Sequence, residues 1–298
     1  MILSVHSLYA MLKKIKLLTV CAGLFSAVAM AGCQAIRTQT SASTAPSAVA
    51  GQVAAAFQKI QTTGVLVLYD GKQLHRYGND PERAHQRYVP ASTFKILNAL
   101  IGLQYHKTTP DEVFKWDGQK RAFKQWEKDL TLAQAMQVSA VPVYQTLARR
   151  IGLQRMASEV KRVGYGNQSI GTQVDNFWLV GPLEITPVEE VKFVYALAHQ
   201  QLPFDSLTQQ QVKQMLLIED RNGTKIYAKS GWGMDVNPQV GWWTGWVEQA
   251  GGQVTAFSLN MEIKKQQDLE ARQLIVYQAL QQLGGLPGQC LDKKRPSL

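Results

Sequence analysis

Residues 88–100, YVPASTFKILNAL, begin an apolar helical run that places Lys95 three residues after Ser92. Side chains at i and i+3 of a helix lie on one face, so the two groups are expected to meet. Apolar neighbours such as Phe94 and Ile96 predict that Lys95 is buried, and burial lowers the pKa of a lysine toward neutrality. A neutral lysine can take the proton of a serine hydroxyl, which is a poor nucleophile on its own. The stretch therefore predicts a nucleophile–base pair; a helix cap followed by a solvent-reaching lysine is the structural alternative.

The spacing alone is not specific, because a second Ser-x-x-Lys occurs at Ser158 and Lys161. That copy lies in a charged helical segment, and we interpret it as solvent-facing surface. The first copy is followed, in chain order, by Ser139-Ala140-Val141 in a helical block and by Lys229-Ser230-Gly231 on a predicted strand. Ser-x-x-Lys, Ser-x-Val and Lys-Ser-Gly in this order are typical of serine β-lactamases and penicillin-binding proteins.

From about residue 51 to about residue 285, the chain resembles the class D, or oxacillinase-type, serine β-lactamases. The resemblance rests on these motifs together with Tyr165-Gly166-Asn167 and Trp178-Leu179-Val180-Gly181, and the segments FKWDGQKRAF and KSGWGMDVNPQVGWWTGWVE resemble the carbapenem-hydrolysing subgroup. It implies an α/β fold of the α+β type: an antiparallel sheet flanked by helices, plus a helical lobe, as in penicillin-binding transpeptidases. It also implies hydrolysis of penicillins and carbapenems.

The resemblance implies five catalytic residues. Ser92 would form an acyl-enzyme, and Lys95, carboxylated by CO₂ to N6-carboxylysine, would be the general base. Ser139 would relay a proton to the lactam nitrogen, Lys229 would supply a positive field, and Trp178 would donate its indole N–H to the carbamate; a core aromatic is the structural reading of Trp178. No metal and no cofactor other than CO₂ or bicarbonate is expected.

A second group is expected to contact the β-lactam substrate. The backbone N–H groups of Ser92 and Trp232 would form an oxyanion hole, and Arg272 would bind the substrate carboxylate, although a helix-surface arginine is an alternative. Val141 and Leu179 would be apolar walls that control water access. Phe123 and Met234 would meet over the cleft and form an apolar bridge. The full set is Val141, Leu179, Ser230, Trp232, Arg272, Phe123, Met234 and Tyr165.

Hydrophobic periodicity predicts strands at both ends of the chain and helices between them. A hairpin is expected over 64–78 around Asp70-Gly71, and strands over 225–232, 239–249 and 253–263. Helices are expected over 92–104, 131–137, 141–152, 153–164, 186–201, 207–219 and 268–283. We expect residues 51–91 and 205–298 to form a mixed α/β lobe and residues 92–204 a helical lobe, with the site between them.

The first 32 residues have the form of a secretory signal, with three lysines, no acidic residue and an apolar stretch. Met30-Ala31-Gly32-Cys33 resembles a lipoprotein cleavage box, so Cys33 is expected to be lipidated; cleavage after Ala31 is the alternative. Residues 33–50 are expected to be a flexible linker. These features predict a periplasmic protein, tethered to the membrane if Cys33 carries lipid, that is a monomer or weak dimer.

The formal net charge is +10, and the 29 basic and 22 acidic residues after residue 32 leave +7. This excess favours anionic ligands. The sequence has no basic run with interleaved aromatic residues, so it does not predict nucleic-acid binding. Three alternative functions stay open: a penicillin-binding D,D-peptidase, a β-lactam sensor acylated without turnover, and a catalytically inactive wall-binding module. Turnover separates the hydrolase from the first two, and absence of acylation would indicate the third.

Overall fold

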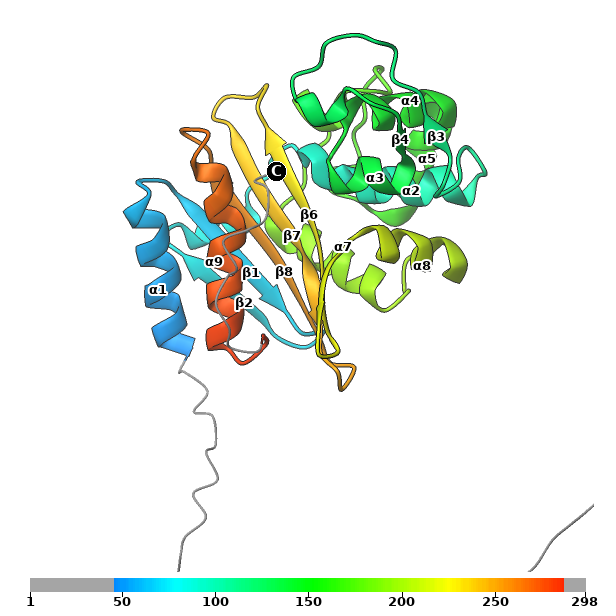
Figure 1. Cartoon of the computed structure of the whole chain (residues 1–298). Coiled ribbons are helices and arrows are strands. Elements are labelled where there is room, and N and C mark those ends of the chain that lie inside the picture. Colours follow the sequence, from blue (N-terminus) through cyan, green and yellow to red (C-terminus); the bar gives the residue numbers. More distant parts are fainter. Residues whose placement is uncertain (1–45, 287–298) are drawn as a thin grey trace, which may run out of the picture. The chain divides into compact units, whose positions relative to one another are not determined.

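Strands from the two ends of the chain lie side by side in the computed structural model, which describes residues 46–286 (Figure 1). They form a six-stranded antiparallel sheet in the order β2-β1-β8-β7-β6-β5. The strands are β1 Gly64–Tyr69, β2 Leu74–Gly78, β5 Leu217–Arg221, β6 Thr224–Gly233, β7 Val240–Glu248 and β8 Val254–Glu262. The predicted hairpin, the three later strands and their shared antiparallel sheet are confirmed.

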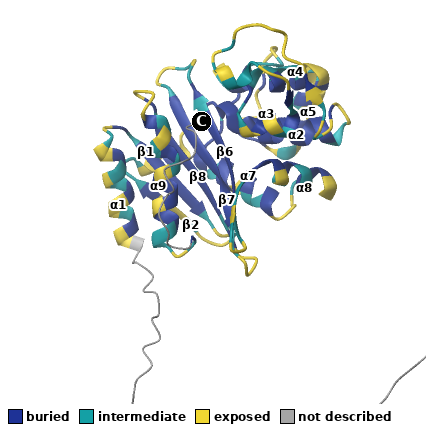
Figure 2. Ribbon diagram, viewed as in Figure 1, coloured by how far each residue is buried: buried dark blue, intermediate teal, exposed yellow. Residues whose placement is uncertain are grey.

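Both faces of the sheet are covered, which explains why its central strands are apolar throughout. In β1, Val65 and Val67 enter one hydrophobic core, whereas Leu66 and Leu68 enter the other. Helices α1 (Pro46–Lys59) and α9 (Asp268–Gln282) pack on one face, and α7 (Pro187–Ala198) packs on the other. The central strands are accordingly buried along most of their length (Figure 2).

The remaining helices form a lobe beside β6, as the sequence predicts (Figure 1). They enclose one side of the larger hydrophobic core, together with the two-stranded sheet of β3 (Val113–Phe114) and β4 (Leu130–Thr131). The helices are α2 Lys95–Gln104, α3 Leu132–Gln137, α4 Val141–Ile151, α5 Leu153–Val163, α6 Phe177–Val180 and α8 Ser206–Met215.

Several predicted boundaries and lobe assignments differ from the structure. Helix α1 begins at Pro46, inside the predicted linker, because Val49, Val53 and Phe57 bury one face of an alanine-rich helix. Helix α7 packs on the sheet although it was assigned to the helical lobe, and α8 packs against α2 although it was assigned to the other lobe. The predicted helix 207–219 ends at Met215.

The chain continues from α8 into β5, which the sequence prediction missed. Asn222 and Gly223 connect β5 to β6 as a two-residue turn, with φ of 51° and 83°. Asn-Gly is the preferred pair for such a turn because both positions need positive φ. The apolar run Leu216–Ile218 reads equally well as the end of a helix, which is why the strand was assigned to one.

The predicted signal segment, Cys33 and most of the predicted linker lie outside the described residues. Among residues 46–286, no helix combines the length and the hydrophobicity needed to cross a membrane. The same residues contain no group of histidine, cysteine or acidic side chains placed to hold a metal ion.

Candidate active site

Ser92 lies in a tight turn immediately before α2. The 3₁₀ helix η2 (Ala91–Phe94) leads into α2 at Lys95, so the helix predicted from Ser92 begins as a 3₁₀ turn. Ala91 has a φ of 49°, in the left-handed region that non-glycine residues rarely adopt. The Thr93 hydroxyl donates a 2.9 Å hydrogen bond to the Pro90 carbonyl. The turn is therefore held locally, and Ser92 faces an open pocket.

Lys95 is fully buried directly behind Ser92. Its Nζ lies 2.6 Å from Ser92 Oγ, and it lies 5.6 Å from the centre of the Tyr144 ring. No acidic side chain among residues 46–286 pairs with Lys95, and burial alone lowers its pKa to about 7. The predicted meeting of these two side chains is confirmed, and a lysine reaching solvent is excluded. A large part of the Lys95 population can be neutral at physiological pH.

A second serine–lysine pair stands across the site. Lys229, on β6, places its Nζ 2.8 Å from Ser139 Oγ, in the turn between α3 and α4. The same ammonium donates to the Ser230 carbonyl at 2.8 Å. Burial, together with the charges of Lys95 and Arg272, holds the pKa of Lys229 well below its usual range. The structure thus joins two motifs that are 90 residues apart in the sequence.

The turn Ala91–Phe94, which carries Ser92 and is called the nucleophile turn below, packs closely on β6. This close packing depends on Gly231. A Cβ added there would lie 3.1 Å from the Pro90 carbonyl oxygen and 3.2 Å from Thr93 Cγ2. The buried Trp242 indole donates a 3.0 Å hydrogen bond to the Val89 carbonyl and fixes the same segment to β7. The Lys-Ser-Gly motif therefore has a packing reason for its glycine as well as a chemical reason for its lysine.

Trp178 lies buried on α6, beside Phe94, one of the two residues between Ser92 and Lys95. Its ring stacks on Phe94, with centroids 5.4 Å apart and an interplanar angle of 22°. No acceptor among the described residues reaches its Nε1. The structural reading of Trp178 as a core aromatic is correct, and its indole N–H remains available to a further acceptor.

Arg272 is buried on α9, so its interpretation as a helix-surface arginine is wrong. Its Nη1 donates to the Gly231 carbonyl at 2.6 Å and its Nε to the Leu269 carbonyl at 2.7 Å. Burial lowers its pKa to about 10, which leaves the guanidinium charged at neutral pH. Two backbone contacts hold this cation at the pocket wall.

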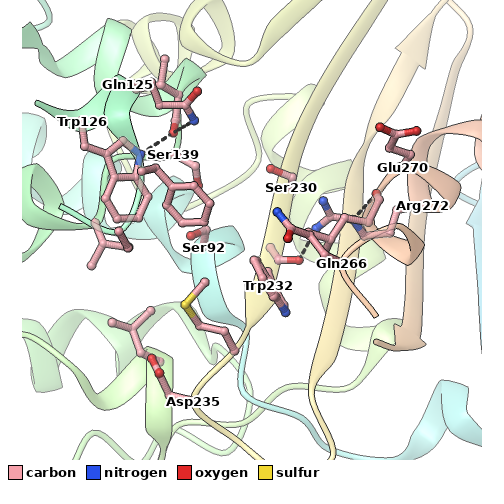
Figure 3. A pocket seen from close by; sticks show the side chains of 18 of the residues that line it. Ser92, Gln125, Trp126, Ser139, Ser230, Trp232, Asp235, Gln266, Glu270 and Arg272 are labelled. Carbon is pink, nitrogen blue, oxygen red and sulfur yellow. Dashed lines mark hydrogen bonds between the residues drawn. The ribbon is translucent and has the colours of Figure 1, made fainter. Parts of the chain in front are cut away.

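Figure 3 shows the side chains that surround the pocket. The pocket has a volume of about 650 Å³. It is lined by residues from both lobes, and Lys95, Lys229 and Trp178 lie buried behind its walls. The predicted residues that line it are Ser92, Phe123, Ser139, Val141, Leu179, Ser230, Trp232, Met234 and Arg272.

Tyr165 does not line the pocket, which corrects its assignment to substrate binding. Its side chain is buried and donates a 2.8 Å hydrogen bond to Glu190 Oε2 on α7. It also packs edge-on against Phe94. The tyrosine therefore supports the nucleophile turn from within the core. Tyr-Gly-Asn could not reveal this, because Glu190 lies 25 residues farther along the chain.

Several pocket residues were not anticipated from the sequence. Trp126 packs on Phe123 with ring centroids 4.7 Å apart, and its indole donates to the Val138 carbonyl at 2.9 Å. Asp235 and Glu270 add two carboxylates to the walls. They lie close in sequence to predicted site residues, Met234 and Arg272, and this proximity was an available signal.

Comparisons with known proteins agree with this geometry. The family model described as the penicillin binding protein transpeptidase domain matches residues 53–281. The β-lactamase OXA-10 of Pseudomonas aeruginosa is 41% identical over 236 residues, covering 78% of this chain and 88% of the relative. The β-lactamase OXA-48 of Klebsiella pneumoniae is 39% identical over 227 residues, covering 76% and 85%. The solved structure of the class D β-lactamase YbXI from Nostoc is 36% identical with a TM-score of 0.74, covering 78% of this chain and 98% of that one.

Proposed function

The chain belongs to the class D β-lactamases, hydrolases that open the β-lactam ring, and from this premise we propose how its own residues carry out the reaction. The observation that carries the proposal is the Ser92–Lys95 pair, with Nζ 2.6 Å from Oγ and the lysine fully buried. A lysine whose pKa is near 7 is matched to accept a proton at physiological pH.

In the first half-reaction, Ser92 Oγ attacks the lactam carbonyl carbon while its proton passes to neutral Lys95. The backbone N–H groups of Ser92 and Trp232 stabilise the oxyanion. The carbon–nitrogen bond then breaks, and the Ser139 hydroxyl relays to the lactam nitrogen the proton that Lys95 took from Ser92, which leaves Lys95 neutral again. Lys229, 2.8 Å from that hydroxyl, stabilises the charge that develops on it. The product of this step is an ester between Ser92 and the opened ring.

The carboxylate that β-lactam antibiotics carry binds beside Arg272 and Ser230. Both residues line the pocket, and the buried Lys229 amine lies behind Ser230. An arginine held by two backbone contacts presents its remaining N–H groups without losing further conformational freedom on binding. The net positive charge of the chain attracts such anions at longer range.

The residues around Lys95 also fit carboxylation by CO₂. Only a neutral amine reacts with CO₂, and burial of Lys95 makes that form accessible. The buried Trp178 N–H, which has no acceptor among the described residues, and the Ser92 hydroxyl are donors for the added group. When present, the carbamate supplies a general base for the water that hydrolyses the acyl-enzyme. Val141 and Leu179, on the pocket walls, control the approach of that water.

We propose penicillins and carbapenems as substrates. The pocket supports this range because aromatic and sulfur-containing side chains, Phe123, Trp126, Trp232 and Met234, line it in addition to the polar groups. These side chains offer apolar contact over the small substituents of a carbapenem as well as the larger side chains of penicillins.

Steady-state hydrolysis followed by ultraviolet absorbance tests the proposal. We expect turnover of a penicillin and a carbapenem, stimulated by bicarbonate and abolished by Lys95→Ala. Lys161→Ala is the matched control, because Lys161 belongs to the second Ser-x-x-Lys, on the exposed surface of α5. A single burst equal to the enzyme concentration, without turnover, would contradict the proposal and indicate a penicillin-binding or sensor activity.

A further inference from the structure

The proposed chemistry leaves the two acidic side chains of the pocket without a role. Asp235 and Glu270 line its walls, and both are exposed. No ion pair or hydrogen bond joins either carboxylate to another described residue. Because the ligand that this pocket binds is an anion, an unpaired carboxylate on its wall is unfavourable unless it meets a different part of the ligand.

The two carboxylates lie at different ends of the pocket (Figure 3). Glu270 is on α9, two residues before Arg272, at the end proposed for the substrate carboxylate. Asp235 follows the last residue of β6 by two positions, beyond Trp232. Along the chain, Ser230 at the proposed carboxylate end is therefore followed by Gly231, which packs against the turn that carries Ser92, and then by Asp235, just beyond the end of β6.

A substrate with its carboxylate at Arg272 and its carbonyl at Ser92 must extend its acylamino side chain in the remaining direction. That direction leads along β6 toward Leu179, Met234 and Asp235, all of which line the pocket. The first two offer apolar contact for a ring, and Asp235 is the charged residue at this end.

We propose that Asp235 is a specificity-determining residue that favours β-lactams with a cationic acylamino side chain and disfavours those with an anionic one. The inference rests on the substrate placement given under the proposed function. Because Asp235 is exposed, water screens each interaction, and a change of about threefold in kcat/KM is expected for each sign of charge. In the ratio of kcat/KM for a cationic substrate to that for an anionic one, the two threefold effects multiply to about tenfold.

Three penicillins with the same phenyl-bearing core provide the probes. Ampicillin carries an amine on the side chain, benzylpenicillin carries no charge there, and carbenicillin carries a carboxylate. The readout is the ratio of kcat/KM for ampicillin to that for carbenicillin, measured with saturating bicarbonate at one pH close to 7, where much of the ampicillin amine is protonated and Lys95 is partly neutral. A ratio cancels any change that affects all substrates equally.

We expect Asp235→Asn to lower this ratio by about tenfold and Asp235→Lys to lower it further. Glu270→Gln is the matched control: it removes the same charge from the same pocket at the other end, and the ratio should change less than twofold. Added salt should reduce the wild-type ratio and leave that of Asp235→Asn nearly constant.

An unchanged ratio in Asp235→Asn and Asp235→Lys, with benzylpenicillin still hydrolysed, would overturn this inference and leave the proposed function intact. An equal fall in Glu270→Gln would also overturn it, because the effect would then come from the general field of the pocket. Failure to hydrolyse benzylpenicillin would instead refute the proposed function itself.

Discussion

Lys95 is an amine buried away from water, and this burial sets the pH at which it can accept the proton of Ser92. Burial lowers its pKa to about 7, so the amine is neutral above that pH and protonated below it. We predict that the acylation rate of Ser92 by a penicillin rises as the pH increases through about 7 and then levels off. Stopped-flow measurement of acylation over this range tests the prediction. A rate that does not change across that pKa would mean that Lys95 is not the base.

Glu190 shows the opposite effect of burial on an acid. It lies in the core on α7, where burial raises its pKa from 4.5 to about 7, against the opposing effect of the Tyr165 hydrogen bond. The folded state therefore keeps a proton that the unfolded state has lost, and the free energy of unfolding falls as the pH rises from about 4.5 to about 7. The loss is at most about 3 kcal/mol.

We predict that Glu190→Gln removes this loss, since glutamine keeps an oxygen acceptor for Tyr165 and cannot ionise. The variant should gain stability relative to the wild-type protein above pH 7 and gain little near pH 4.5. Chemical denaturation at both pH values gives the comparison, in which other titrating groups cancel. A stability difference that is independent of pH would show that Glu190 is ionised in the folded protein across this range.

At the scale of elements, the approach of β6 to the nucleophile turn fixes the catalytic geometry. Gly231→Ala would place a Cβ within 3.2 Å of atoms from Pro90, Thr93 and Trp242. Two of these atoms belong to buried side chains and one to the backbone, so the turn or the strand must shift. We predict a loss of about 1–3 kcal/mol in stability and a fall in kcat/KM.

Gly251→Ala is the control for that substitution, because a Cβ at Gly251, in the loop between β7 and β8, meets nothing within 4 Å. Thermal unfolding and benzylpenicillin hydrolysis should both remain close to the wild-type values in this variant. If Gly231→Ala behaves in the same way, the packing of β6 on the turn does not determine the position of Ser92.

The helices and strands predicted correctly are those in which the spacing of apolar residues fits only one kind of element. The hairpin 64–78 and the strands in 225–263 have apolar runs bounded by turn residues, and the strands formed as expected. Strand β5 is not predicted because the apolar residues after Met215 continue a helical pattern, although Asn222-Gly223 is a hairpin signal. Helix α1 is not predicted, and its first residues fall in the expected linker, because they are small residues that are also typical of linkers.

On the scale of the whole molecule, the pocket is made where the helical lobe meets the sheet. Phe123 precedes the 3₁₀ helix Lys124–Trp126 of the helical lobe, and Met234 follows β6. Phe123 lies edge-on to Trp232 at a centroid distance of 6.4 Å. Both Phe123 and Met234 line the pocket. Their contact with each other across it, the apolar bridge, stays a prediction.

We predict that replacing both Phe123 and Met234 with alanine lowers kcat/KM for a carbapenem more than for a penicillin, by about tenfold. A carbapenem has small ring substituents and depends on the bridge for apolar contact, whereas a penicillin side chain reaches other walls. Steady-state kinetics with one substrate of each kind test this expectation. Equal losses for the two substrates would refute the bridge.

The sequence specified the chemistry of the site better than its surroundings. Ser92 and Lys95 are three residues apart on one helical face, so local geometry alone predicts their contact. The support of the turn by Trp178, Glu190 and Gly231 depends on tertiary packing between distant segments, which no local pattern encodes. For the same reason the sequence does not show that Tyr165 supports the turn instead of contacting the substrate, or that Asp235 lines the pocket.

The central claim is that buried Lys95 is neutral enough to serve as the base for Ser92 and to take up CO₂. The most direct measurement is ¹³C NMR of the protein in ¹³C-labelled bicarbonate, since it detects a carbamate without relying on activity. We expect one carbamate resonance in the wild-type protein and in Lys161→Ala, lost in Lys95→Ala and lost from the wild-type protein as the pH falls below about 7. No resonance from a wild-type sample that turns over penicillin would contradict the account, and so would a resonance that survives in Lys95→Ala.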